Sequence, residues 1–140
     1  MIKIYKDSSE KVFMVNVVSS FDVPSDWTHI CDNPESLPLS KFFDAWKDNG
    51  NGTVGIDLPT ARQIKLDEIR AKRDAMLKKT DERFVEELSK AADTSSIEAD
   101  KQALRDITTQ AETDLASKIK DTTIDAYDAF ASLTLSESYE

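Results

Sequence analysis

The chain has 140 residues, of which 39% are hydrophobic and 32% charged, with 18 Lys and Arg side chains against 27 Asp and Glu. The resulting net charge of −9 argues against nucleic-acid binding, which needs a concentrated Lys/Arg patch. No run approaches the roughly 20 apolar residues of a membrane span, and the first residues lack the apolar stretch of a signal peptide, so we expect a cytoplasmic protein without a membrane partner. The single cysteine, Cys31, cannot close an internal disulfide.

The composition changes near residue 58. Residues 1–58 hold all three glycines, three of the four prolines, both tryptophans and the only histidine, whereas residues 59–133 lack glycine and are rich in good helix formers. This change predicts an α+β protein, with a small β-rich head of a hairpin, a short helix and a strand, followed by a long helical hairpin. The final residues, 134–140, are acidic, and we expect them to fray.

Two strands open the predicted head. Residues 1–5 alternate between polar and apolar side chains, residues 12–18 are β-branched and aromatic, and residues 7–10 between them suit a turn. Prolines then mark an irregular stretch, in which Trp27 and Ile30 are expected to cover the apolar face of the hairpin.

A short helix and a strand complete the head. Ser40 can cap a helix that runs to Trp46, and a glycine-rich turn leads into a strand over residues 54–57. Phe42, Phe43 and Trp46 form an aromatic cluster beside this turn, which is typical of an interface anchor, and Phe84 further along is another candidate for partner binding. The alternative is that the cluster is the core of the head.

Two helices follow the head. Asp57 or Thr60 can cap the first, over residues 60–92, and a Ser95–Glu98 capping box starts the second, over 95–120, with apolar spacing that continues to residue 131. Contacts within the helical hairpin, or between copies, are predicted at Ile69, Arg73, Met76, Leu77, Leu104, Ile107 and Leu115.

The length of the first helix bears on assembly. A helix of about 30 residues is about 45 Å long, and a two-helix hairpin has too little core to stand alone. We therefore expect the hairpin to pack on a partner or on another copy, as a dimer because two-fold symmetry is the commonest. Two shorter helices folded back on the head are the alternative.

Catalysis and metal binding find little support. His29, Cys31 and Asp32 cluster, but structural zinc needs four N/S ligands, and His29 and Cys31 at i,i+2 would share one face of a strand. The loop 48–54 resembles a calcium loop, yet Lys47 and Leu58 stand where it needs oxygen ligands. Paired carboxylates on the helices have Lys or Arg three or four residues away, as on a solvated surface. We expect no enzyme activity, no metal and no cofactor.

Two helical motifs carry a resemblance to a known family. Residues 69–81 read I-R-A-K-R-D-A-M-L-K-K-T-D, and residues 101–107 read K-Q-A-L-R-D-I. In this order the two segments resemble the "R-x-x-R-(N/D)-x-L-L-x-x-T-D" and "R-Q-A-L-R-D-(I/L)" motifs of bacteriophage tail and tail-fibre assembly chaperones. The similarity covers about residues 65–110. The aromatic residue that commonly follows Thr-Asp is replaced by Glu82 and Arg83, with Phe84 behind them.

The resemblance implies a non-enzymatic accessory protein in the cytoplasm of the infected cell. Its partner would be a tail fibre protein, usually bound at the distal end, which it would help to fold or form trimers. The motif residues that match are Arg70, Arg73, Asp74, Leu77, Thr80 and Asp81, and then Gln102, Ala103, Leu104, Arg105 and Asp106. We expect both motifs to hold the helical hairpin together, and the head's aromatic residues or the acidic tail to contact the client. The alternative is a structural tail or fibre-attachment component that stays in the virion.

Overall fold

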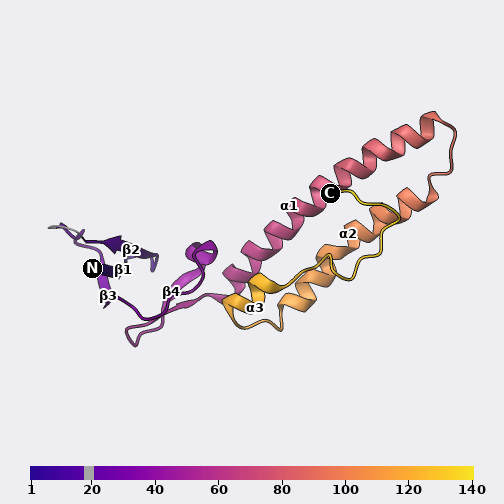
Figure 1. Ribbon diagram of the computed structural model, residues 1–140. Helices are drawn as coiled ribbons and strands as arrows, with labels where there is room; N and C mark the ends of the chain where they lie inside the picture. The colour runs from indigo at the N-terminus through magenta and orange to yellow at the C-terminus, as the bar shows by residue number, and fades with distance from the viewer. Residues whose placement is uncertain (18–20) are drawn as a thin grey trace. The chain divides into compact units, whose positions relative to one another are not determined.

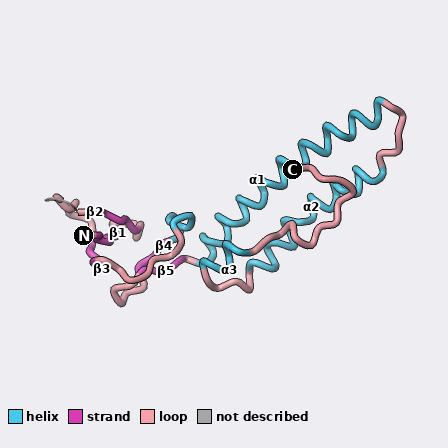
Figure 2. Tube along the Cα trace, in the orientation of Figure 1, coloured by secondary structure: helices cyan, strands magenta, loops and turns pink. Residues whose placement is uncertain are grey.

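The computed structural model describes residues 1–17 and 21–140, which form two compact units. The N-terminal unit comprises Met1–Ala61 and Ile119–Thr123, and the helical unit comprises Arg62–Lys118 and Ile124–Glu140. The strands come first in the chain and the long helices follow (Figure 1, Figure 2), which confirms the α+β prediction.

The chain begins with the predicted β-hairpin. Strand β1 (Ile2–Lys6) pairs antiparallel with β2 (Val12–Asn16). Asp7 closes the turn because its Oδ1 accepts a hydrogen bond from the backbone N–H of Ser9 at 2.9 Å. Val18, which the predicted second strand included, lies outside the described residues.

A third strand, β3 (Thr28–Asp32), pairs with β1 where the sequence predicted an irregular stretch, so that part of the prediction is wrong. The register shifts between Ile4 and Tyr5, and as a result Ile4 lies opposite Cys31 while Tyr5 lies opposite His29. Because neighbouring residues of a strand point to opposite faces, this bulge sends Cys31 and His29 to opposite faces of the sheet. The prediction that these two side chains share a face is therefore wrong.

A short helix and a second hairpin follow. The 3₁₀ helix η1 (Ser40–Ala45) leads into β4 (Trp46–Asp48), which pairs antiparallel with β5 (Val54–Ile56) around a turn with two glycines at φ of 80° and 81°. The predicted short helix and strand are confirmed, but Ser40 does not cap the helix. Leu39 holds the cap position, without a side-chain hydrogen bond.

The core of the N-terminal unit joins the two sheets. Its buried members are Ile4, Val12, Trp46 and Val54, and partly buried Ile30, Cys31, Leu37, Phe43 and Ile56 pack against them. Both hairpins therefore bury one face in the same cluster, which fixes the three-stranded sheet against the β4–β5 pair.

Helix α1 (Leu58–Ser89) has 32 residues and begins directly after Asp57, two residues before the predicted residue 60. Asp57 supplies the cap, because its Oδ2 accepts hydrogen bonds from the backbone N–H of Thr60 at 3.3 Å and from the Thr60 hydroxyl. The length agrees with the predicted long helix. The helix ends before the predicted residue 92.

Helix α2 (Ser95–Leu115) starts at the predicted residue, but its N-terminal cap differs from the predicted one. Thr94 holds the cap position without a side-chain hydrogen bond, and Asp93 Oδ1 accepts the backbone N–H of Ser95 at 2.9 Å, so the predicted Ser95–Glu98 capping box does not form.

The second helix also stops before the predicted residue 120. The Arg62 guanidinium donates to the carbonyl oxygen of Lys118 at 2.8 and 3.2 Å, which satisfies a backbone acceptor beyond the end of α2. Only a six-residue helix, α3 (Asp121–Ala126), follows in place of an extension to residue 131. Among the described residues, no helix combines the length and the apolar character needed to cross a bilayer.

Helices α1 and α2 lie side by side as the predicted hairpin (Figure 1). The predicted contact positions are buried at Ile69, Met76, Leu104, Ile107 and Leu115 and half-buried at Arg73 and Leu77. Arg73 Nη1 donates to Thr108 Oγ1 at 2.6 Å, which links the two helices through a polar pair inside the apolar stripe. Contacts of these residues between copies remain a prediction.

The C-terminal residues 134–140 correct the expectation of a frayed tail. Tyr139 is 2% exposed and packs with Met76 and Leu104 of the two helices. Its hydroxyl donates to Asp100 at 2.5 Å, and Glu137 pairs with Arg83 at 2.7 Å. The local sequence is polar and gives no sign of these long-range partners.

We expect Leu104→Ala to destabilise the helical unit by about 2–5 kcal/mol, because Leu104 is completely buried and its truncation leaves a cavity between the helices. Leu88→Ala on α1 is the matched control, since Leu88 is 59% exposed. Urea unfolding followed by circular dichroism checks both. Equal stability losses for the two variants would contradict the observed packing.

The tyrosines give a second prediction. Burial and a hydrogen bond to Asp100 raise the pKa of Tyr139 to about 12, and burial with a hydrogen bond to Asp114 raises the pKa of Tyr127 to about 12. Their neutral forms thus stabilise the fold below the ordinary pKa of about 10, and this contribution is lost as the pH rises toward 12. In an absorbance titration at high pH, Tyr139→Phe should remove one late-titrating phenol and leave that of Tyr127. Titration of both near pH 10 in the folded protein would contradict this.

Candidate partner-binding site

The aromatic cluster singled out in the sequence lies mainly in the core of the N-terminal unit. Phe42 is fully buried and Trp46 is 6% exposed, and the indole N–H of Trp46 donates to the carbonyl of Leu39 at 3.2 Å. Phe43 is half-buried, with its ring centroid 5.0 Å from that of Trp46. The core alternative describes Phe42 and Trp46, whereas Phe43 keeps some surface for a partner.

Phe84 belongs to the contact between the helices. It is half-buried on α1, and the ammonium group of Lys101 on α2 lies 4.8 Å from its ring centroid. Lys101 also pairs with Asp81 at 2.6 Å. Binding of a partner at Phe84 stays a prediction.

A second aromatic cluster, which the sequence reading missed as a site, covers the other face of the three-stranded sheet. We call it the aromatic face, and its members are Tyr5, Phe13, Phe21, Trp27 and His29. The rings of Phe13 and Trp27 are stacked, with centroids 4.6 Å apart and an interplanar angle of 8°. The Tyr5 ring centroid lies 5.8 Å from that of Trp27 and 5.4 Å from that of His29, whose ring it meets edge to face. Phe21 extends the cluster, 6.2 Å from Trp27.

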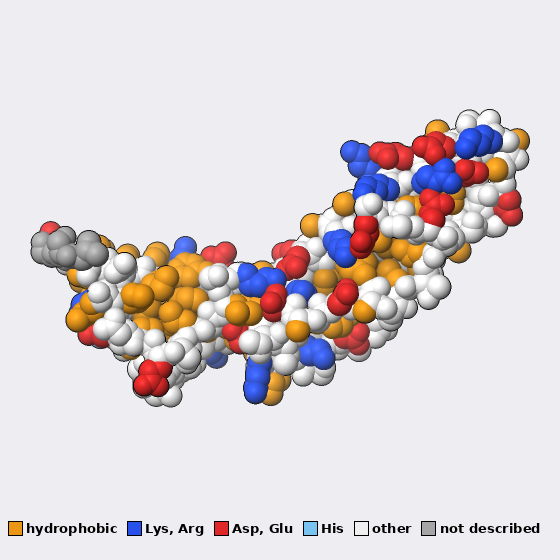
Figure 3. All heavy atoms as spheres, in the orientation of Figure 1, with side chains coloured by type: hydrophobic (Ala, Val, Ile, Leu, Met, Phe, Trp, Pro, Cys, Tyr) orange, Lys and Arg blue, Asp and Glu red, His pale blue; other side chains and the backbone are white. Residues whose placement is uncertain are grey.

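The aromatic face is only partly buried. Tyr5 is 6% exposed, Phe13 and Trp27 are half-buried, and Phe21 is 41% exposed. Hydrophobic side chains reach the surface of the N-terminal unit in Figure 3. Apolar rings that stay partly in water, in fixed orientations, are the arrangement that anchors protein interfaces.

Charged groups border the aromatic face. Asp32 accepts a hydrogen bond from His29 Nε2 at 2.7 Å and pairs with the ammonium group of Lys3 at 3.3 Å. The hydrogen bond with His29, and to a lesser extent the contact with Lys3, lower the pKa of Asp32 below its ordinary value. Lys11 lies over the Phe13 ring at 5.4 Å. An aromatic centre with a polar rim matches the usual anatomy of a protein–protein interface.

The strand pattern could have revealed this face. Tyr5 and Phe13 alternate with Ile4 and Val12, so both faces of the hairpin carry apolar side chains. The sequence reading placed Trp27 and Ile30 on one apolar face. The structure divides them, because Trp27 stacks on the aromatic face whereas Ile30 packs in the core cluster.

The residues considered for catalysis or metal binding are spread over different environments. Burial raises the pKa of the Cys31 thiol, which lies in the core cluster away from His29. Asp48 of the glycine-rich loop accepts the backbone N–H of Gly50 at 2.9 Å and pairs with Lys6 at 3.1 Å. Within residues 1–17 and 21–140, no group of three or more His, Cys, Asp or Glu side chains is placed to hold a metal ion.

Several motif residues of the helical unit contact the other helix of the hairpin, whereas Asp74, Gln102, Arg105 and Asp106 are exposed. Arg73 pairs with Asp74 at 2.8 Å, while Arg70 pairs with Asp67 at 3.3 Å and with Glu112 of α2 at 3.4 Å. Oppositely charged side chains are interspersed over this unit (Figure 3), as on a solvated helix surface.

No protein-family model, no curated protein and no solved structure matches the chain. The resemblance to assembly chaperones stays a prediction from the motif residues.

The two tryptophans should report the difference between core and aromatic face. Trp46→Phe leaves Trp27, whose emission we expect to be red-shifted and readily quenched by acrylamide because its ring is half-exposed. Trp27→Phe leaves the buried Trp46, whose emission should be blue-shifted and weakly quenched. Equal quenching of the two variants would contradict the exposure of the aromatic face.

Proposed function

We propose that the chain is a non-enzymatic binding protein that assists the folding or assembly of a bacteriophage tail fibre in the infected cell. One observation carries the proposal: several of the motif side chains that resemble assembly chaperones, among them Arg70, Arg73 and Leu104, take part in the α1–α2 contact, while the aromatic face of the N-terminal unit is only partly buried. The helical hairpin then acts as a scaffold, and the aromatic face binds the client.

The chemistry of the aromatic face suits a protein client. Stacked Phe13 and Trp27 rings offer a rigid apolar surface that loses little side-chain entropy when it is covered. Lys3, Lys11 and Asp32 at the border supply polar contacts and orientation. The separation of His29 from Cys31 by the sheet supports a role other than nucleophilic catalysis.

A structural tail or fibre-attachment component is the second candidate. Val85 and Leu88 near the end of α1 are 64% and 59% exposed. Exposed apolar side chains on a long helix favour contacts with another copy or with a virion protein. Retention of the chain in purified virions would favour this candidate.

Co-expression with the tail fibre protein of the same phage tests the chaperone proposal. We expect soluble fibre only when this chain is present, and a complex that survives a pull-down with a stoichiometry measurable by light scattering. Trp27→Ala should weaken the complex about tenfold or more, as expected for an aromatic anchor. Met14→Ala is the matched control, because Met14 is 50% exposed in the same sheet but points away from the aromatic face.

Two results would count against the proposal. Fibre that folds without this chain, with nothing co-purifying, would remove the chaperone. Equal loss of the complex in the Trp27 and Met14 variants would move the client away from the aromatic face.

A further inference from the structure

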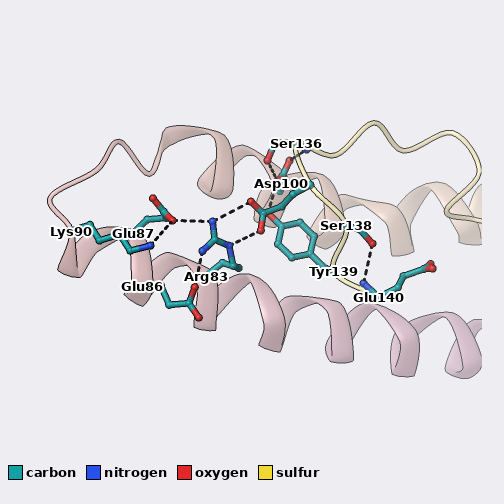
Figure 4. Close-up of polar contacts among 10 residues, drawn as sticks. Arg83, Glu86, Glu87, Lys90, Asp100, Ser136, Ser138, Tyr139 and Glu140 are labelled. Atoms are coloured by element: carbon teal, nitrogen blue, oxygen red, sulfur yellow. Dashed lines mark hydrogen bonds and ion pairs between the residues drawn. The ribbon is translucent and has the colours of Figure 1, made fainter.

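The C-terminal residues 134–140, which we call the strap, cross the helical hairpin as an extended segment (Figure 4). They lie outside the chaperone-like motifs and outside the aromatic face. Their contacts with the two helices resemble those between a peptide and a binding groove, with two polar anchors and one apolar anchor.

Asp100 on α2 is the first anchor of the strap. Its side chain is buried, and it accepts hydrogen bonds from the backbone N–H of Ser136 at 2.9 Å, from the Ser136 hydroxyl and from the Tyr139 hydroxyl at 2.5 Å. Burial opposes the charge on Asp100, but these hydrogen bonds outweigh it and lower its pKa. A buried carboxylate is costly without donors, and here the strap supplies them.

Basic residues of α1 form the second anchor. Arg83 Nε donates to Glu137 at 2.7 Å, while the same guanidinium pairs with Glu86 at 2.6 Å and Glu87 at 2.9 Å (Figure 4). Lys72 pairs with Glu140 at 3.2 Å. An acidic strap thus meets positive side chains on α1, although the whole chain is acidic.

Tyr139 is the apolar anchor. Its ring lies between the helix that carries Arg83 and the helix that carries Asp100 (Figure 4), and it packs with Met76 and Leu104. Pockets of about 410 Å³ and 280 Å³ remain beside the strap, the first along Met76 and the second along Arg83.

We propose that the α1–α2 groove also binds the strap of a second copy of this chain, so that two copies exchange straps and form a closed dimer. The groove fits an extended acidic segment with a serine hydroxyl for Asp100, a carboxylate for Arg83 and a tyrosine three residues after the serine. A second copy carries this segment in full, and reciprocal exchange satisfies Asp100 in both copies. The proposal is independent of the proposed chaperone function.

The tethered strap competes with exchange. A short linker gives a segment an effective concentration on the order of 1 mM, so the wild-type chain should be mainly monomeric at micromolar concentration and dimerise as it is concentrated. Exchange is therefore best tested where the internal contact is removed.

Two variants each disable one side of the contact between the strap and the groove. Tyr139→Ala breaks the strap and leaves the groove, whereas the double variant R83E/D100N breaks the groove and leaves the strap. Each alone should be monomeric by light scattering, and an equimolar mixture should form a heterodimer, because only the mixture contains an intact strap and an intact groove. Circular dichroism of each variant confirms that the helices persist, and the double variant S136A/E137A, which removes the side-chain contacts to Asp100 and Arg83, replaces Tyr139→Ala if they do not.

A labelled peptide with the sequence of residues 133–140 gives the second measurement. Fluorescence anisotropy should show it binding the Tyr139→Ala chain about tenfold or more tightly than the wild-type chain, whose own strap competes, and binding R83E/D100N weakly. A mixture that stays monomeric while the peptide binds would overturn the second copy as the occupant. Failure of both the mixture and the peptide would overturn the groove as a binding site.

Discussion

Tyr139 completes a core that two helices cannot close by themselves. Helices α1 and α2 offer each other one apolar stripe, and the phenol ring packs against Met76 and Leu104 where those stripes meet. Its hydroxyl ends on Asp100, so the same side chain covers apolar surface and satisfies a buried carboxylate. The helical unit therefore gains a third layer from the chain terminus, where the sequence predicted a frayed end.

A register shift has a comparable effect in the N-terminal unit. The bulge between Ile4 and Tyr5 lets β3 place Cys31 in the core and His29 among the aromatic rings. Without this shift the two side chains would share one face, as a regular strand requires. One irregular position therefore builds the core and the aromatic face from the same strand.

Local signals in the sequence account for much of the fold. The alternating residues of β1 and the long run of helix formers in α1 are local features, and the structure confirms both predictions. The structure also selects Asp57 from the two predicted caps of α1. Strand β3 was not predicted because Thr28, His29 and Asp32 lack the apolar alternation typical of a strand. The strand forms through its pairing with β1.

Features that depend on polar contacts between distant residues could not be predicted from the sequence. The end of α2 depends on Arg62, which is far away in the chain, and the strap depends on Asp100. The sequence indicates part of the aromatic face, because Tyr5 and Phe13 alternate with core residues along their strands. The contacts of Trp27 with both rings form only in the folded sheet and could not be predicted from the sequence.

The placement of the motif residues bears on what their resemblance to assembly chaperones can mean. Leu104 is buried, Leu77 is half-buried and Arg73 reaches Thr108 across the hairpin, so these motif residues serve the packing of α1 against α2. A packing role of these residues does not by itself define a client. Under the proposed function, client specificity belongs to surfaces outside residues 65–110, and the aromatic face of the N-terminal unit is a partly buried surface of that kind.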